Sequence, residues 1–288
     1  MNSEQNLYSI LSQLILPENK KKQSNDLFDN WVEGIIKKDQ YTFNDGIIGL
    51  GWLVAFLIEK QQIEGNVDEI LEDVDDNLYK FTLKTILDEQ TEIDQILVLI
   101  EYYHQRLFDI KSKAGFYRRF SYYENMKLLL EKLNTILGEP ITDDNLNLKI
   151  RVLLKYSHLI QTCIPETLIE VPFYQQIERL INYFQELEPA PASDELTINL
   201  LKLSMCAKQY ENPYWVEKVN EIYAKLIEPI YQEHQSSVEI SIWKKTISSL
   251  PEPTLGYYHY HDYWKTEKGK HLLFTLYTNI KSFELSYD

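Results

Sequence analysis

The sequence is poor in glycine and proline, with 9 glycines and 10 prolines among 288 residues. Both residues concentrate in turns and interrupt regular elements, so their scarcity favours long helices over a loop-rich β protein. Cysteine is scarcer still, because only Cys163 and Cys206 are present, each alone in an apolar helical context. They form neither a CxxC pair nor a disulfide framework, which fits a reducing compartment.

Long uncharged apolar stretches are also missing. No window approaches the roughly 18 residues that a membrane-spanning helix needs. The first residues, MNSEQNLYSILSQLILPENKKK, do not resemble a signal peptide, because their charges follow the apolar part and polar residues interrupt it. We therefore expect a cytoplasmic protein without a membrane partner.

Basic residues are fewer than acidic ones. The chain has 29 Lys and Arg against 44 Asp and Glu, so its formal net charge is 29 − 44 = −15. Such a surface repels phosphate backbones, and we expect no nucleic-acid partner. An acidic surface would attract a basic partner, but it also serves solubility, which is the interpretation that we favour.

Apolar residues recur at helical spacing along nearly the whole chain, and no stretch alternates convincingly at period two. About twelve helices are expected: 6–16, 25–38, a glycine-led helix ending near 62, 67–86, 91–110, 116–137, 142–164, 172–187, 195–209, 213–234, 238–250 and 266–283. The short loops between them predict antiparallel helical hairpins in a single all-α domain over residues 1–288. Any internal break is expected near 188–195 (EPAPASDE), where Ser193 caps the next helix, and a kink is expected at Pro229.

Four of the nine glycines lie in one stretch, residues 44–69 (NDGIIGLGWLVAFLIEKQQIEGNVDE). Gly46, Gly49 and Gly51 lead directly into Trp52 and an apolar helix. A glycine inside a helix costs about 1 kcal/mol relative to alanine, so something must offset that cost. Either another segment packs closely against the helix, or a ligand reaches its backbone. These three glycines and Trp52 are therefore candidate binding residues.

The segment 41–76, YTFNDGIIGLGWLVAFLIEKQQIEGNVDEILEDVDD, resembles the glycine-led inner-helix segment of lanthionine synthetase C-like proteins. The resemblance implies an α/α toroid, complete or incomplete, in which an outer ring of helices surrounds an inner ring. Enzymes of that family bind zinc through two cysteines and a histidine. The metal activates a peptide thiol for addition to a dehydrated serine or threonine.

The chain departs from the pattern of those enzymes at the zinc ligands. Neither Cys163 (IQTCIPE) nor Cys206 (LSMCAKQ) precedes a histidine or lies in a glycine turn. The later glycine turns are missing as well, since Gly256 and Gly269 stand alone. No catalytic residue is carried over, we expect neither a metal nor another cofactor, and we interpret the glycines at 46–51 as a packing device.

The resemblance therefore predicts a catalytically degenerate, non-enzymatic protein of this family. It would bind a peptide or protein as an accessory in the maturation of modified peptides. Two alternatives remain open. One is an active cyclase-type enzyme that adds a thiol to a dehydroamino acid, and the other is an α-helical interaction scaffold unrelated to peptide maturation.

The nearest local cluster of potential metal ligands is His259, His261 and Asp262, with His271 on the next helix. In an extended strand, the His-x-His spacing would place both rings on one side, a geometry that suits zinc. The surrounding run YYHYHDYW favours the other explanation, an aromatic plug with hydrogen-bonded histidines. His259 and His261 remain candidate binding residues, whereas His158 (KYSHLI) is expected to be structural.

Acidic residues crowd the start of the expected 67–86 helix. Six carboxylates fall within nine residues: Asp68, Glu69, Glu72, Asp73, Asp75 and Asp76. Their spacing lacks the interleaved glycine of an EF-hand, so a solvated acidic face is favoured over a cation site. Asn66 is expected to cap the helix, with Glu69 completing a capping box and Ile70 on the buried face.

Aromatic residues are abundant, with 21 Tyr, 11 Phe and 5 Trp. Tyrosine and tryptophan often anchor peptide and protein interfaces. They also build cores, and for most of these residues an aromatic core is the favoured interpretation.

Overall fold

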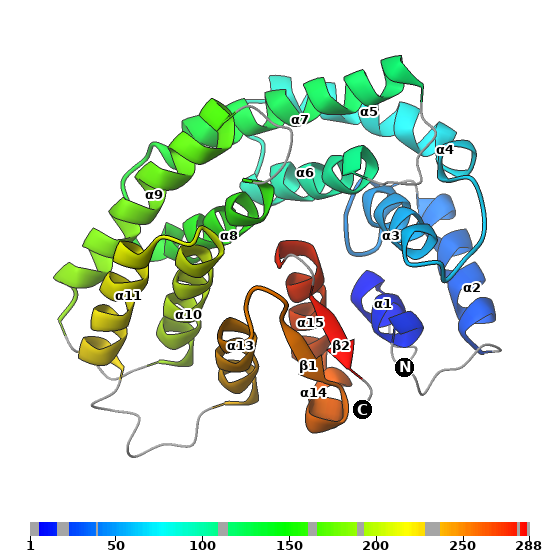
Figure 1. Ribbon diagram of the computed structural model, residues 1–288. Coiled ribbons are helices and arrows are strands. Elements are labelled where there is room, and N and C mark those ends of the chain that lie inside the picture. The colour runs from blue at the N-terminus through cyan, green and yellow to red at the C-terminus, as the bar shows by residue number, and fades with distance from the viewer. Residues whose placement is uncertain are drawn as a thin grey trace. The chain divides into compact units, whose positions relative to one another are not determined.

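The computed structural model shows a predominantly helical, all-α chain (Figure 1). The residues it describes are 6–15, 23–38, 40–108, 115–160, 166–188, 193–227, 237–280 and 283–286. The chain divides into two compact units, Met1–Thr135 and Ile136–Asp288. Cys163, Pro229 and residues 189–192 of the stretch 188–195 lie outside the described residues.

Helix α3 (Ile47–Glu59) is the centre of the first unit, because every residue from Ile47 to Ile58 is buried. It packs against α1, α2, α4, α5 and α6. The other helices of this unit are α1 (Leu7–Ile15), α2 (Gln23–Lys38), α4 (Val67–Ile70), α5 (Glu72–Leu87), α6 (Ile93–Phe108) and α7 (Phe116–Leu137). The apolar composition of α3, which leaves no polar face, is what a helix surrounded by others requires.

Helix α10 (Asp194–Gln209) is the centre of the second unit, as α3 is of the first. It packs against α8 (Asp143–Leu159), α11 (Pro213–Leu226) and α13 (Val238–Ser248), while α9 (Glu166–Glu186) packs against α8 and α11. Figure 1 shows α9 and α11 as a second layer beside α8 and α10. The C-terminal part contains β1 (Thr254–Gly256), η2 (Tyr258–Tyr260), α14 (His261–Trp264), α15 (Glu267–Asn279) and β2 (Glu284–Ser286).

Side-chain caps fix the starts of several helices. The Ser193 hydroxyl accepts a hydrogen bond from the Leu196 amide at 3.0 Å, which confirms the cap expected for α10. Asn212 accepts from the Tyr214 and Trp215 amides, and Pro213 occupies the first helical position, where its missing N–H has no cost. These polar residues stop each helix from running on into the preceding loop.

The expected 67–86 helix is in fact two helices, because the chain turns at Leu71 between α4 and α5. Asn66 caps α4 as expected, by accepting from the Asp68 amide at 3.2 Å. Glu69, however, accepts from the Asn66 side chain and not from its backbone. The turn also rotates Ile70 away from the core, so that 50% of this residue is exposed and its expected burial is wrong.

Two further expectations about elements are corrected. Helix α9 begins at Glu166 and not at Pro172, which lies inside the helix. Its neighbours Ile169 and Phe173 are buried, and their packing offsets the hydrogen bond that proline removes. The expected helix 266–283 ends at Asn279, and β2 then pairs in parallel with β1, with Leu255 opposite Leu285. Both leucines are buried, so this short sheet has an apolar face that three-residue segments were too short to reveal by alternation.

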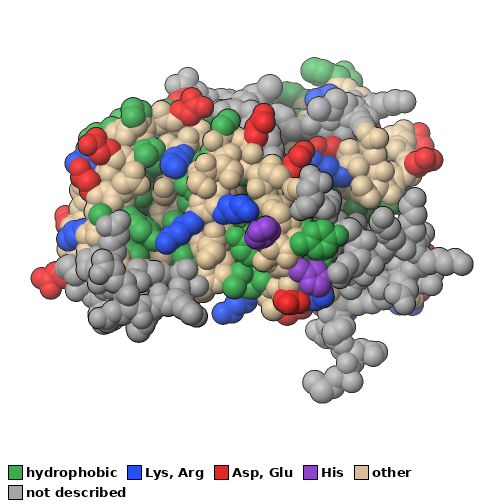
Figure 2. Space-filling model, turned by 60° about the horizontal axis from the view of Figure 1, so that its bottom comes forward, with side chains coloured by type: hydrophobic (Ala, Val, Ile, Leu, Met, Phe, Trp, Pro, Cys, Tyr) green, Lys and Arg blue, Asp and Glu red, His purple; other side chains and the backbone are tan. Residues whose placement is uncertain are grey.

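In the part of the chain that the structure describes, no helix has both the length and the apolar character required to cross a membrane. Figure 2 shows one face of the molecule, on which Lys and Arg side chains are interspersed with Asp, Glu and hydrophobic ones. On this face the acidic excess of the sequence is therefore not gathered into a single negative patch.

Candidate functional site

The glycine-led start of α3 lies directly beneath the loop that precedes it. The Ile47 amide donates to the Gln40 carbonyl at 2.8 Å, and the Leu7 amide of α1 donates to the Asn44 carbonyl at 2.7 Å. A Cβ atom added to Gly49 would lie 1.7 Å from the Phe43 carbonyl oxygen. The loop can approach the helix this closely only because Gly49 has no side chain.

Gly51 and Trp52 continue the same packing. A Cβ on Gly51 would lie 2.7 Å from the Tyr102 ring of α6, so this glycine allows α3 and α6 to meet. Trp52 is 1% exposed and stacks on Phe56 with 5.0 Å between ring centroids. Gly46 is similarly enclosed, since its Cβ would lie 2.4 Å from the Gln40 carbonyl oxygen. Of the two explanations for these glycines, the structure shows close packing, and their binding role stays a prediction.

Gly49→Ala should lower the free energy of unfolding by roughly 2 kcal/mol or more, because the Phe43 backbone must move to admit the methyl group. Gly34 provides a matched control, since it lies inside α2 with no atom within 4 Å of its Cβ position. Gly34→Ala should instead raise stability by about 0.5–1 kcal/mol. Urea unfolding measures both changes, and a neutral Gly49→Ala would show that the loop is not held against α3.

The predicted histidine cluster does not lie on an extended strand, which corrects that part of the sequence analysis. His259 lies in the 3-10 turn η2, and His261 begins α14. The His261 Nδ1 atom is 3.2 Å from an Asp262 carboxylate oxygen and 3.3 Å from the Lys265 ammonium nitrogen. Among the described residues, no group of three or more His, Cys, Asp or Glu is arranged to hold a metal ion. The assignment of His259 and His261 as binding residues stays a prediction.

Cys206 is fully buried in α10. Burial raises the pKa of its thiol to about 12, although a hydrogen bond with Ser157 works in the opposite direction. The thiolate is the form that binds metals and acts as a nucleophile, and at neutral pH this cysteine remains a thiol. Its surroundings are those of a core residue.

We therefore expect Cys206 to be inert toward a thiol reagent in the folded protein at pH 8. In a Cys163→Ala variant, where Cys206 is the remaining cysteine, reaction with a chromogenic disulfide should proceed only as fast as the protein unfolds. Denaturant should then release one thiol per chain. Rapid reaction of the folded variant would contradict the burial of Cys206.

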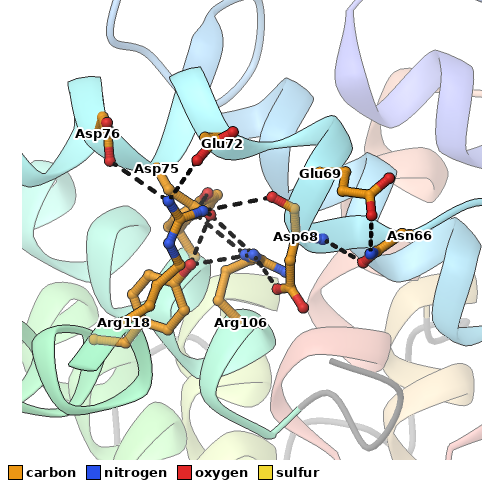
Figure 3. A network of polar contacts seen from close by, with 10 residues as sticks. Asn66, Asp68, Glu69, Glu72, Asp75, Asp76, Arg106 and Arg118 are labelled. Carbon is orange, nitrogen blue, oxygen red and sulfur yellow. Dashed lines mark hydrogen bonds and ion pairs between the residues drawn. The ribbon is translucent and has the colours of Figure 1, made fainter. Parts of the chain in front are cut away.

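The acidic run at 68–76 is divided between solvent and core. Figure 3 shows Arg106 of α6 and Arg118 of α7 directed toward Asp75, with Asp68 on the other side of Arg106. Asp75 is 4% exposed, and the side chain of Asp68 is 12% exposed. The expectation of a wholly solvated acidic face is therefore wrong for these two residues. The turn at Leu71 allows both carboxylates to reach the guanidinium of Arg106.

Asp75 is the centre of this buried network. Arg106 donates to both of its carboxylate oxygens, from Nε at 3.2 Å and from Nη2 at 2.9 Å. The hydroxyls of Tyr102 and Tyr122 also donate to Asp75, that of Tyr122 at 2.6 Å. Arg118 lies 3.6 Å from the same carboxylate. One carboxylate thereby connects α5 with α6 and α7.

The network also changes the acidity of its members. Burial lowers the pKa of the Arg106 guanidinium, but the hydrogen bonds and negative charge of Asp75 outweigh that effect and raise it overall. Burial and the charge of Asp75 raise the pKa of Tyr102 and of Tyr122. All three groups therefore keep their protons at neutral pH, which suits a structural network better than proton transfer.

Asp75→Ala should lower the free energy of unfolding by about 3–5 kcal/mol, because it leaves the Arg106 charge buried without its main partner. Asp76 is a matched control one residue away, with a side chain 67% exposed and 3.9 Å from Arg118. Asp76→Ala should change stability by less than about 0.5 kcal/mol. Chemical denaturation of both variants tests this, and equal effects would rule out a central role for Asp75.

A cleft of about 550 Å³ opens in the second unit at the C-terminal ends of α8, α10 and α13. Its volume lies within the roughly 300–1,000 Å³ typical of ligand pockets. The residues lining this cleft, which we call the α8–α10–α13 cleft, are Ser157, His158, Lys208, Gln209, Glu211, Ile247, Ser248, Leu250, Pro251 and Glu252. Of these residues, only His158 is a candidate from the sequence, where a structural role is expected for it.

Hydrogen bonds organise the inner wall of the cleft. The Ser157 hydroxyl donates to the Gln209 side-chain oxygen at 2.9 Å, and the Gln209 amide nitrogen donates to the Asn279 carbonyl at 3.3 Å. His158 Nδ1 lies 2.7 Å from the Thr278 carbonyl oxygen, so the proton of the neutral ring sits on Nδ1. These bonds hold the polar wall in one conformation, and the structural role expected for His158 stays a prediction.

The outer edge of the cleft carries charges of both signs. The partly exposed Lys208 is positive, and the exposed carboxylates of Glu211 and Glu252 are negative. Glu211 has a left-handed backbone with φ of 57°, which glycine adopts more easily. The amides of Glu211 and Asn212 donate to the carbonyls of Lys208 and Ala207, so this residue closes α10 in a Schellman motif. A glutamate here keeps a carboxylate at the cleft despite the conformational cost.

Comparison with known proteins finds no matching family model, no matching curated protein and no matching solved structure. The resemblance of segment 41–76 to lanthionine synthetase C-like proteins therefore stays a prediction.

Proposed function

We propose that the protein is a non-enzymatic helical binding protein that holds a short polar peptide segment in the α8–α10–α13 cleft. The observation that carries this proposal is that the cleft and a second hollow meet at the same two residues. A groove of about 680 Å³ along α11 shares two lining residues with the cleft, Lys208 and Glu211. Cleft and groove together form an elongated site, which suits a chain-like ligand better than a compact one.

The chemistry of the lining suits a peptide as well. A peptide backbone offers donors and acceptors in alternation, and the site offers both an ammonium and carboxylates. Ile247, Leu250 and Pro251 add an apolar surface against which a ligand side chain can pack. A ligand with charge of a single sign would leave part of this mixed edge unpaired.

The non-enzymatic part of the proposal draws support from Cys206. In the enzymes of the resembled family two cysteines and a histidine hold the zinc, whereas Cys206 is fully buried within α10 and belongs to no group of three or more His, Cys, Asp or Glu among the described residues that could hold a metal ion. A catalytically degenerate member of the lanthionine synthetase C-like family, acting as an accessory in modified-peptide maturation, fits this environment. This assignment depends on the resemblance of segment 41–76.

The toroid implied by that resemblance is also a proposal. In an α/α toroid, successive helices alternate between two layers, so each helix packs beside the next but one. Within the first unit α3 packs on α6, with the short α4 and α5 together forming the segment between them. Within the second unit α8 packs on α10, with α9 between them in sequence, and α10 packs on α13, with α11 as the described helix between them. These pairings are the ones that an inner layer of such a fold would contain.

Binding can be tested by fluorescence anisotropy with labelled peptides of mixed charge that contain cysteine and dehydrated serine. The double variant Lys208→Met/Glu211→Gln should weaken binding of the best peptide by about tenfold or more, because it removes both charges where cleft and groove meet. Lys202→Met is the control, since Lys202 is on the same helix and does not line the cleft. Its affinity should match that of the wild type.

Two results would contradict the proposal. Peptide binding that the double variant leaves unchanged would place the site elsewhere, and a panel without any binder would favour a scaffold of another kind. Stoichiometric zinc in protein purified without chelator, lost in Cys206→Ala or in His259→Ala, would instead favour the cyclase-type enzyme.

A further inference from the structure

A second cavity of the same unit, of about 400 Å³, lies among α10, α13 and α15. We call it the α10–α13–α15 cavity. Its lining residues are Lys202, Glu239, Trp243, Glu267, Lys268, His271, Leu272 and Thr275. None of them lines the α8–α10–α13 cleft, so a ligand here would be independent of the proposed peptide site.

Lys202 is the unusual residue of this cavity. It is only partly exposed, and it makes no hydrogen bond or ion pair with any residue that the structure describes. Burial lowers the pKa of its ammonium group, and the positive charge of Arg151 on α8 lowers it further, while Glu239 partly compensates. An ammonium group withdrawn from water without a direct partner is costly to the folded protein.

His271, on the facing helix α15, lies near the same positive charges. Solvent reaches this residue, yet the surrounding protein lowers the pKa of its ring, and so do the charges of Arg151 and Lys202. Lys268 completes the set of basic groups at the cavity. The positive charges of Arg151 and Lys202 thus act on His271 across three helices, and an anion would relieve this electrostatic environment.

The carboxylates of the cavity are engaged by other residues. Glu239 accepts a hydrogen bond from the Tyr263 hydroxyl at 3.4 Å, and Glu267 accepts from the Lys270 ammonium at 2.8 Å. Trp243 is fully buried, and its indole N–H has no hydrogen-bond partner in the described part of the chain. The cavity therefore contains the Lys202 ammonium, to which neither of its carboxylates is bonded among the described residues.

We propose that the α10–α13–α15 cavity is a binding site for the anionic group, carboxylate or phosphate, of a small molecule. Lys202 is the principal contact, and Lys268 and His271 lie beside it in the lining. Binding the anion would neutralise the partly buried ammonium that has no other partner among the described residues, and charge-assisted hydrogen bonds of this kind are the stronger ones.

The test measures the midpoint of thermal unfolding as inorganic phosphate or, separately, acetate is added, with sodium chloride holding the ionic strength constant. At least one anion should raise the midpoint of the wild-type chain in a saturable manner. In Lys202→Met the fitted dissociation constant should rise by about tenfold or more, since the variant keeps the apolar stem and loses the charge. Lys202→Gln provides a second neutral variant should the first fail to fold.

Lys208→Met is the matched control on the same helix and should retain anion binding within about twofold. Stabilisation by phosphate and not by acetate would identify a phosphate site, and the reverse a carboxylate site. If neither anion stabilises the wild type, or if the Lys202 variants respond as the wild type does, the proposal is overturned. If the peptides fail to bind but an anion still stabilises the wild-type chain through Lys202, the proposed function is contradicted and the anion site is not.

Discussion

The first unit depends on the buried hydrogen bonds and ion pairs that the carboxylate of Asp75 makes. This carboxylate accepts hydrogen bonds from Arg106, Tyr102 and Tyr122, so α5, α6 and α7 converge on one buried charge. Tyr102 connects this charge to the glycine-led helix, since its ring packs where a side chain at Gly51 would lie. The missing side chain and the buried ion pair are therefore parts of one arrangement: the glycine allows α3 and α6 to approach, and the approach places the tyrosine hydroxyl on Asp75.

In the second unit, one helix serves two different cavities. Lys202 and Lys208 both belong to α10, but at about 100° per residue their positions lie on different faces of the helix. Lys208 lies at the edge of a cleft whose charges are mixed, whereas Lys202 lies in a cavity whose two carboxylates, Glu239 and Glu267, are bonded to other residues. The contrast in their surroundings supports a peptide for the first and an anion for the second.

Much of the fold could be predicted from the sequence, because helix signals are local. The apolar periodicity of α6, the Ser193 cap of α10 and the Asn66 cap of α4 depend on neighbours within a few residues. Other features depend on partners far away in the chain and escaped prediction. Pro172 is accommodated within α9 by packing, and β1 finds its partner strand about thirty residues later. The candidate site was missed for the same reason, since its lining converges from three helices and a turn.

The local residue pattern is enough to predict that the chain is helical, where most helices begin, and that the glycines at 46–51 require either close packing or a ligand. The close packing at Gly49 and Gly51, and the identity of the acids of the run 68–76 that face inward, are visible only in the folded chain. Periodicity reports the face that a residue occupies on its own helix and says nothing of what packs against that face. The cost of burying Asp75 or Lys202 depends on the groups that meet it there, and those groups come from distant parts of the chain.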